Sequence, residues 1–167
     1  VLDGSMGHEL KQRGVVSSFA DGMLANASAS EAIQAVHAEY ITAGCDVLTT
    51  NTFTLTAEAM GDHLEALPHL LHAACACAND AVASTPSSRQ VLVAGCLPPL
   101  RHCYLPELVR PEEEMLPLYE ELVKELAPRV DMFLAETLCC SAEARAALRA
   151  ASPTGKSVWL SLTLHDD

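Results

Sequence analysis

Short apolar runs alternate with longer amphipathic segments along the whole chain. The runs are apolar on both faces, which is typical of parallel strands covered by helices. The predicted strands are Val1–Asp3, Asp46–Thr52, Val91–Leu97, Met132–Leu138 and Val158–Leu164. The predicted helices between them are Ser30–Ala43, Ala57–Val82, Pro111–Leu126 and Ser141–Ala150. The pattern therefore predicts an α/β fold in which helices pack on a parallel sheet.

Residues at the ends of these segments support the predicted helices. Ser30 is expected to cap the first helix, and Gly44 stands where that helix should end. Pro111 precedes three glutamates, which suit the positive end of a helix dipole. Ser141 is expected to open the last helix in the same manner. We therefore expect regular helices between the strands.

Two sheet architectures fit this order of elements. Five parallel strands form either an open doubly wound sheet or part of an eight-stranded barrel, and the pattern alone does not separate them. The chain begins directly at Val1 and stops just after a predicted strand, at His165-Asp166-Asp167. We take this ending to favour an interrupted barrel.

Composition narrows the function classes. The 167 residues suit one domain, and half of them are apolar. A net charge of −12 argues against a nucleic-acid surface and against binding to anionic membranes. The seven cysteines are odd in number, several lie in apolar runs, and no membrane-length apolar stretch is present. We expect a cytoplasmic protein with reduced thiols.

Polar residues stand at the ends of three predicted strands. Asp3 and Gly4 end the first, Asn51-Thr52-Phe53-Thr54 end the second, and Glu136 and Thr137 end the fourth. All carboxyl ends of a parallel sheet lie on one side, so these residues are expected to share a pocket. Two carboxylates, an amide and hydroxyls suit a ligand with an ammonium group. The alternative is that the carboxylates only bond to turn amides.

Two other motifs are weaker. His69, His72 and Cys75 share one face of a predicted helix at a spacing that suits metal ligands. We interpret them as packing residues, because that helix faces outward in a barrel. Thr154-Gly155-Lys156-Ser157 lacks the earlier glycine of a phosphate loop and precedes a strand, so we interpret it as a turn.

Together, five segments resemble successive signatures of the homocysteine S-methyltransferases. They are Leu2-Asp3-Gly4-Ser5-Met6-Gly7-His8-Glu9-Leu10, Thr50-Asn51-Thr52-Phe53, Ala94-Gly95-Cys96-Leu97-Pro98-Pro99, Asp131-Met132-Phe133-Leu134-Ala135-Glu136-Thr137 and Val158-Trp159-Leu160-Ser161-Leu162-Thr163-Leu164. The resemblance implies a (β/α)8 TIM barrel, of which this chain supplies about the first five strands and four helices. Residues 1–167 would then be part of a homocysteine-binding domain.

The resemblance also implies a reaction. This family moves a methyl group from a sulfonium, betaine or folate donor to the thiol of homocysteine, forming methionine. It implies that Asp3 and Glu136 hold the ammonium group of homocysteine, that Asn51, Thr52 and Phe53 line the pocket, and that the Gly4 backbone lies close to the amino-acid end. Its small-molecule substrates are then the only partners implied.

The resemblance further implies a zinc ion, which turns the substrate thiol, with an ordinary pKa near ~8.5, into a thiolate. The family's three zinc cysteines lie on later strands, so no position here matches them. Cys139-Cys140 follows the fourth strand and lacks the neighbouring glycines, so it takes no metal role. The alternative is a non-catalytic fragment that binds an amino acid or a partner. Its uncovered sheet edges favour self-association.

Overall fold

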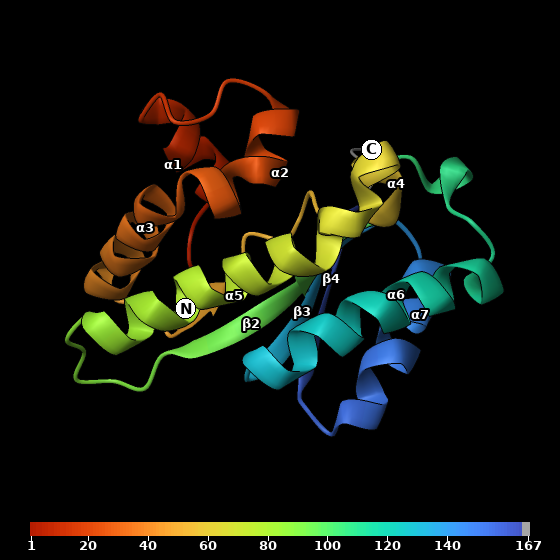
Figure 1. Cartoon of the computed structure of the whole chain (residues 1–167). Coiled ribbons are helices and arrows are strands. Elements are labelled where there is room, and N and C mark those ends of the chain that lie inside the picture. The colour runs from red at the N-terminus through yellow and green to blue at the C-terminus, as the bar shows by residue number, and fades with distance from the viewer. Residues whose placement is uncertain (165–167) are drawn as a thin grey trace.

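The computed structural model describes residues 1–164, with the backbone alone at 19 and 20. Its sheet has four parallel strands, β1 (Val47–Thr49), β2 (Leu92–Leu97), β3 (Met132–Leu138) and β4 (Val158–Leu162). They lie in the order β1-β2-β3-β4 (Figure 1). Each strand pairs with its successor and the order never reverses. This topology is consistent with part of a TIM barrel rather than with a doubly wound sheet.

The first predicted strand differs from the expectation. Residues Val1–Asp3 form only one isolated parallel bridge, from Leu2 to Val47, so four strands stand where five were expected. The segment still lies beside β1, because the amide of Asp3 donates to the carbonyl of Val47 at 3.1 Å. The bridge therefore places Asp3 at the sheet edge that a full strand would have reached.

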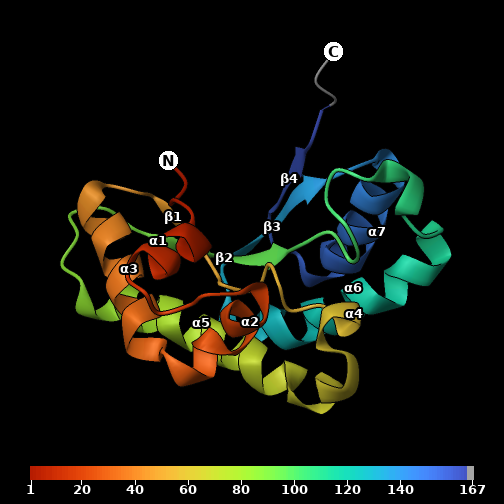
Figure 2. The ribbon, with the colours of Figure 1, turned by 90° about the horizontal axis from the view of Figure 1, so that it is seen from above.

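Seven α-helices occur within the described residues. They are α1 (Met6–Gln12), α2 (Phe19–Ser28), α3 (Ser30–Ala43), α4 (Ala57–Met60), α5 (Leu67–Ser84), α6 (Glu112–Leu126) and α7 (Ser141–Ala151). Short 3-10 turns cover Gly61–Ala66, Pro106–Leu108, Ala127–Arg129 and Ser152–Thr154. Helices α3, α5, α6 and α7 follow the same face of the sheet as an arc (Figure 2). These four helices do not cover the opposite face of the sheet, which carries the cavity described below.

Several helix boundaries differ from the prediction. The single helix expected over Ala57–Val82 is broken, because Gly61 takes φ +50 and Pro68 opens α5. Ser30 is not a cap: it is the first residue of α3, and Ala29 precedes it without a side-chain bond. Gly44 does end α3, in the left-handed conformation at φ +104, as predicted.

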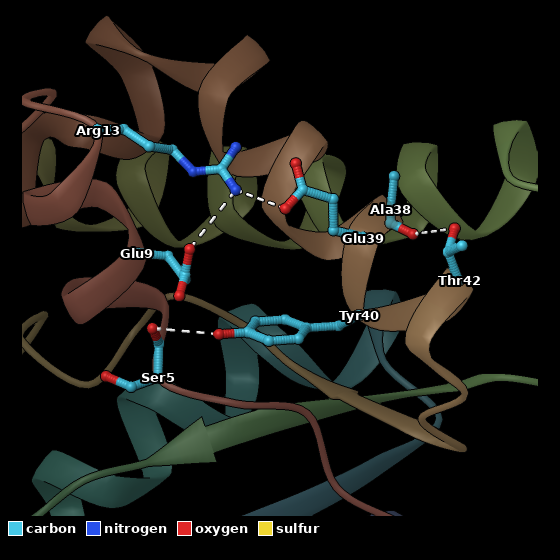
Figure 3. Close-up of polar contacts among 7 residues, drawn as sticks. All are labelled: Ser5, Glu9, Arg13, Ala38, Glu39, Tyr40 and Thr42. Carbon is cyan, nitrogen blue, oxygen red and sulfur yellow. Dashed lines mark hydrogen bonds and ion pairs between the residues drawn. The ribbon is translucent and has the colours of Figure 1, made fainter.

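Helices α1 and α2 lie in a stretch where no helix range was predicted. Ser18 and Asp21 form a reciprocal capping box that starts α2. Arg13, which directly follows α1, bridges two carboxylates, Glu39 of α3 at 2.6 Å and Glu9 at 3.5 Å (Figure 3). Tyr40 of α3 donates its hydroxyl to the carbonyl of Ser5 at 3.3 Å (Figure 3). These contacts hold the N-terminal turn against α3.

Strand alternation divides β3 between two faces. Phe133 and Ala135 join the large core between the sheet and helices α5, α6 and α7, and Leu138 joins it beyond an irregularity of the strand at Thr137. Leu134 instead joins a small cluster on the opposite face. Because side chains alternate along a strand, Glu136 shares the face of Leu134. The carboxylate is therefore directed away from the helices.

The last strand is more exposed than predicted. Trp159, Leu160 and Leu162 are 48%, 44% and 52% exposed, although the pattern predicted a strand covered on both faces. The reason is its edge position: β4 has β3 on one side, and among residues 1–164 no further strand pairs with its other side. The predicted strand end at Leu164 shortens to Leu162, and the ending His165–Asp167 lies outside the described residues.

Candidate functional site

A cavity of about 580 Å³ lies at the carboxyl ends of the strands, on the face that carries Leu134 and Glu136. We call it the first cavity. Its lining comes from the N-terminal turn, the end of β1 with its following loop, and β3. The lining residues are Leu2, Asp3, Gly4, Ser5, Met6, Gly7, Thr49, Thr50, Asn51, Phe53, Thr54, Leu134 and Glu136. Five of the six predicted site residues therefore lie together around one cavity.

Asp3 is held at the edge of the sheet by Thr49 of β1. The amide of Thr49 donates to Oδ2 of Asp3 at 2.8 Å, and its hydroxyl donates to Oδ1 at 2.9 Å. Burial raises the pKa of Asp3 to about 6; the two bonds from Thr49 oppose this rise, and the charge of Glu136 adds to it. The two carboxylates therefore lie close enough to repel each other electrostatically across the first cavity.

Glu136 stands at the end of β3, where the strand becomes irregular. The pairing with β4 shifts between Ala135 and Leu138, and Thr137 takes a left-handed φ of +62. The buried thiol of Cys96, on β2, donates to Oε1 of Glu136 at 3.2 Å. Burial, together with the nearby charge of Glu136, raises the pKa of the Cys96 thiol well above its ordinary value. The thiol is therefore a neutral donor to the carboxylate.

Both carboxylates of the first cavity have only neutral partners among the described residues. Thr49 bonds to Asp3 and Cys96 bonds to Glu136, and neither acid forms an ion pair within residues 1–164. Carboxylates that are partly buried without a counter-charge favour the binding of a cation. An ammonium group in the first cavity would supply that missing charge.

Gly4 is required by the close approach of Tyr40. A Cβ at Gly4 would lie 2.7 Å from the Tyr40 hydroxyl oxygen and 2.8 Å from its ring atom Cε1. The same hydroxyl bonds to Ser5, so the ring is fixed over the turn. A larger residue at this position displaces either the ring or the turn that carries Asp3.

The loop after β1 is fixed from α2. The Asn51 side chain donates to Oδ1 of Asn26 at 3.1 Å, and Nδ2 of Asn26 donates back to the Asn51 carbonyl at 2.8 Å. Asn26 is buried, so this reciprocal pair ties α2 to the cavity wall. Asn51 thus lines the cavity, and its amide group also holds the loop in place.

Thr52 corrects the prediction, because it does not line the first cavity. Its hydroxyl is buried behind the wall, where it donates to the Cys96 carbonyl at 3.0 Å and lies 3.0 Å from the hydroxyl of Thr50. The chain turns after β1, so neighbouring residues 51 and 52 point in different directions. Thr52 therefore braces the loop against β2.

Sequence reasoning missed several residues that shape the cavity. Thr49 is the direct partner of Asp3, and strand alternation from Val47 places it on the inner face. The same alternation from Glu136 would have found Leu134. Asn26 and Tyr40 carried no local signal, since their roles depend on how α2 and α3 pack.

Within residues 1–164 no group of three or more His, Cys, Asp and Glu side chains is placed to hold a metal ion. On α5, Nε2 of His72 lies 2.7 Å from Oε2 of Glu125, and His69 is exposed. Cys75 is buried, which raises its pKa to about 12. In the same part of the chain, no helix is both long and apolar enough to span a bilayer.

Comparison with known proteins shows the family and supports the fold. The family model for homocysteine S-methyltransferase matches residues 1–167. The chain belongs to this family. Two crystal structures of the homocysteine methyltransferase MmuM from Escherichia coli, a metallated and an oxidized form, superpose with a TM-score of 0.87 at 24% identity. They cover 99% of this chain, which spans 63% and 62% of theirs.

Proposed function

We propose that this chain supplies the homocysteine-binding part of a methyltransferase. The complete enzyme moves a methyl group from a sulfonium, betaine or folate donor to the thiol of homocysteine and forms methionine. Its fold is a (β/α)8 barrel, and residues 1–167 contribute the strands that hold the amino-acid end of the substrate. Membership of the family and the shared fold support this proposal.

One observation carries the proposal: Asp3 and Glu136 line the same cavity with only neutral partners in the described chain. The ammonium group of homocysteine lies between them, since it brings the one charge that the cavity lacks. Phe53 and Leu134 provide apolar walls for the side chain of the substrate. Gly4 lets the backbone of the N-terminal turn pass close to the amino-acid end, under the ring of Tyr40.

The family's zinc does not fit the residues of this chain, because no three ligating side chains meet within residues 1–164. We therefore propose that the metal ligands belong to later strands of the complete barrel. The described part binds and orients the amino acid, and it does not by itself activate the thiol. On its own, the chain is expected to bind an amino acid and to catalyse no methyl transfer. The alternative function is the same binding activity in a fragment that never forms part of an enzyme. Its seven free thiols support a cytoplasmic location.

Two isosteric variants test the proposed site in the complete enzyme. Asp3→Asn and Glu136→Gln each remove one charge and keep the shape of the side chain. Each is expected to weaken homocysteine binding at least tenfold, measured by calorimetric titration without a methyl donor. A tenfold loss corresponds to about 1.4 kcal/mol.

Glu58→Gln is the matched control. Glu58 is a carboxylate on the same rim, but Arg101 and Arg110 already neutralise it at 3.0 and 2.7 Å. Its variant should bind homocysteine with unchanged affinity. If Asp3→Asn and Glu136→Gln also bind homocysteine normally, these carboxylates do not hold the ammonium group and the assignment is wrong.

A further inference from the structure

Three half-buried thiols lie where the loop after β2 meets the start of α7: Cys103, Cys139 and Cys140. The sulfur of Cys139 accepts the amide N–H of Tyr104 at 3.0 Å and donates to the carbonyl of His102 at 3.4 Å. These two groups belong to the residues on either side of Cys103. The thiol of Cys139 is therefore bound to the turn that presents Cys103.

This contact limits the distance between the two cysteines. The Tyr104 nitrogen is two bonds, about 2.4 Å, from the Cα of Cys103. The Cys139 sulfur at 3.0 Å from that nitrogen thus lies within about 5.4 Å of this Cα. The Cys103 sulfur is two bonds from this same Cα, so both sulfurs lie close to one backbone atom. Rotation of the Cys103 side chain about χ1 can therefore turn its sulfur toward that of Cys139.

The remaining thiols are far less suited to oxidation. Cys45, Cys75, Cys77 and Cys96 are buried in the core, and burial raises the pKa of each. A buried thiol without a thiolate is inert, whereas a half-buried thiol is accessible to a small oxidant. The cluster around Cys139 is also not a metal site, since no group of three potential ligands occurs in residues 1–164.

We propose that Cys103 and Cys139 form a disulfide when the protein meets a peroxide. The Cys139 thiolate attacks one oxygen of hydrogen peroxide, the O–O bond breaks, and a sulfenic acid and hydroxide form. The Cys103 thiol then attacks the sulfenic sulfur, the S–S bond forms, and the hydroxyl leaves as water. In total, two thiols and one peroxide give one disulfide and two waters.

The disulfide would act on the rim of the proposed binding site. Cys103 lines a second cavity of about 340 Å³, which shares Phe53 and Thr54 with the first cavity. The new bond ties the loop after β2 to the start of α7 and consumes the thiol proton that Cys139 gives to His102. The pair is thus an oxidation site beside the substrate cavity, and its formation does not depend on the proposed methyltransferase activity.

Peptide mapping of the folded protein after hydrogen peroxide treatment tests the pair. Without reduction, trypsin places Cys103 in residues 102–124 and both later cysteines in residues 130–145. We expect one species joining these two peptides, lighter than their sum by two hydrogens, and its disappearance on reduction. It should form with Cys140→Ser and Cys45→Ser, and vanish with Cys103→Ser and Cys139→Ser.

Each other outcome overturns the pairing. A loss of two hydrogens inside peptide 130–145 means a bond between neighbouring Cys139 and Cys140. A linked species that survives in Cys139→Ser but not in Cys140→Ser means a bond from Cys103 to Cys140. Sulfinic acid without any linked peptide means that the thiols do not meet. Circular dichroism before and after oxidation confirms that the protein stays folded.

Discussion

Two cavities lie side by side on the same rim of the sheet and share Phe53 and Thr54, yet their charges are arranged differently. In the first cavity, Asp3 and Glu136 receive hydrogen bonds only from neutral groups among residues 1–164. In the second, Glu58 is paired with Arg101 and Arg110. The first cavity therefore has unpaired negative charge, whereas the carboxylate of the second cavity is neutralised by arginines.

The presence or absence of a paired cation determines which carboxylates are available to a ligand. An exposed ion pair such as that of Glu58 contributes little stability and leaves no charge for a substrate. Asp3 is a partly buried acid without a counter-ion among the described residues, and burial raises its pKa because its charge is poorly solvated. Such a group gains most when a cation enters. The proposed binding function thus rests on incomplete neutralisation rather than on the number of acids.

Reversing the charge of Glu136 should cause the largest change in homocysteine affinity. Glu136→Lys places an ammonium group beside Asp3, so the first cavity becomes internally neutral like the second. Homocysteine binding is expected to fall at least a hundredfold, about 2.7 kcal/mol, in a calorimetric titration of the complete enzyme. Glu58→Lys, which changes charge equally on the same rim, should alter this affinity by less than about threefold. Equal losses in both variants would mean that net rim charge, not the unpaired acids, governs binding.

The pH dependence of binding should be the next largest effect. Only the ionised Asp3 attracts ammonium, and its pKa is raised to about 6. Homocysteine affinity should therefore be constant just above pH 7, where the ammonium group of the ligand is still protonated, and fall up to tenfold per unit below pH 6. The sign for stability is opposite: the raised pKa favours folding below pH 3.8, and this gain is lost as pH rises through about 6.

Thr49→Val sharpens this pH test. The variant removes the side-chain bond that lowers the pKa of Asp3 and keeps the backbone bond. The midpoint of the affinity profile should move to higher pH, while Asp3→Asn should flatten the profile. A midpoint that stays in place in Thr49→Val would show that another group titrates.

The last prediction concerns the stability of the turn that carries Asp3, and it should have the smallest effect on binding. Gly4→Ala forces a Cβ to within 2.8 Å of the Tyr40 ring and should destabilise the fold by about 1–3 kcal/mol, measured by thermal unfolding. Gly7→Ala, three residues later in α1, meets nothing within 4 Å and should be neutral or stabilising by up to about 1 kcal/mol. Equal melting temperatures for both variants would contradict the role assigned to Tyr40.

Sequence patterns predicted the parallel sheet and the meeting of Asp3 with Glu136, because parallel strands all end on one side. They failed for features that depend on how the elements pack against one another. Thr52 was expected in the cavity, but the turn after β1 buries its hydroxyl against Cys96. Helix α2 was not predicted, although its Asn26 holds Asn51. β4 was expected to be covered, and its apolar side chains are exposed.

The sequence by itself determined the order of elements, the ends of helices such as Gly44, and the two acids at strand ends, since these depend on local periodicity and backbone preference. Only the tertiary structure decided that the acids lack counter-charges within the described part of the chain, that Tyr40 closes over Gly4, and that Cys139 contacts the turn at Cys103. These features join residues more than 30 positions apart. No local pattern encodes such contacts, because burial and charge neutralisation arise only when the segments pack together.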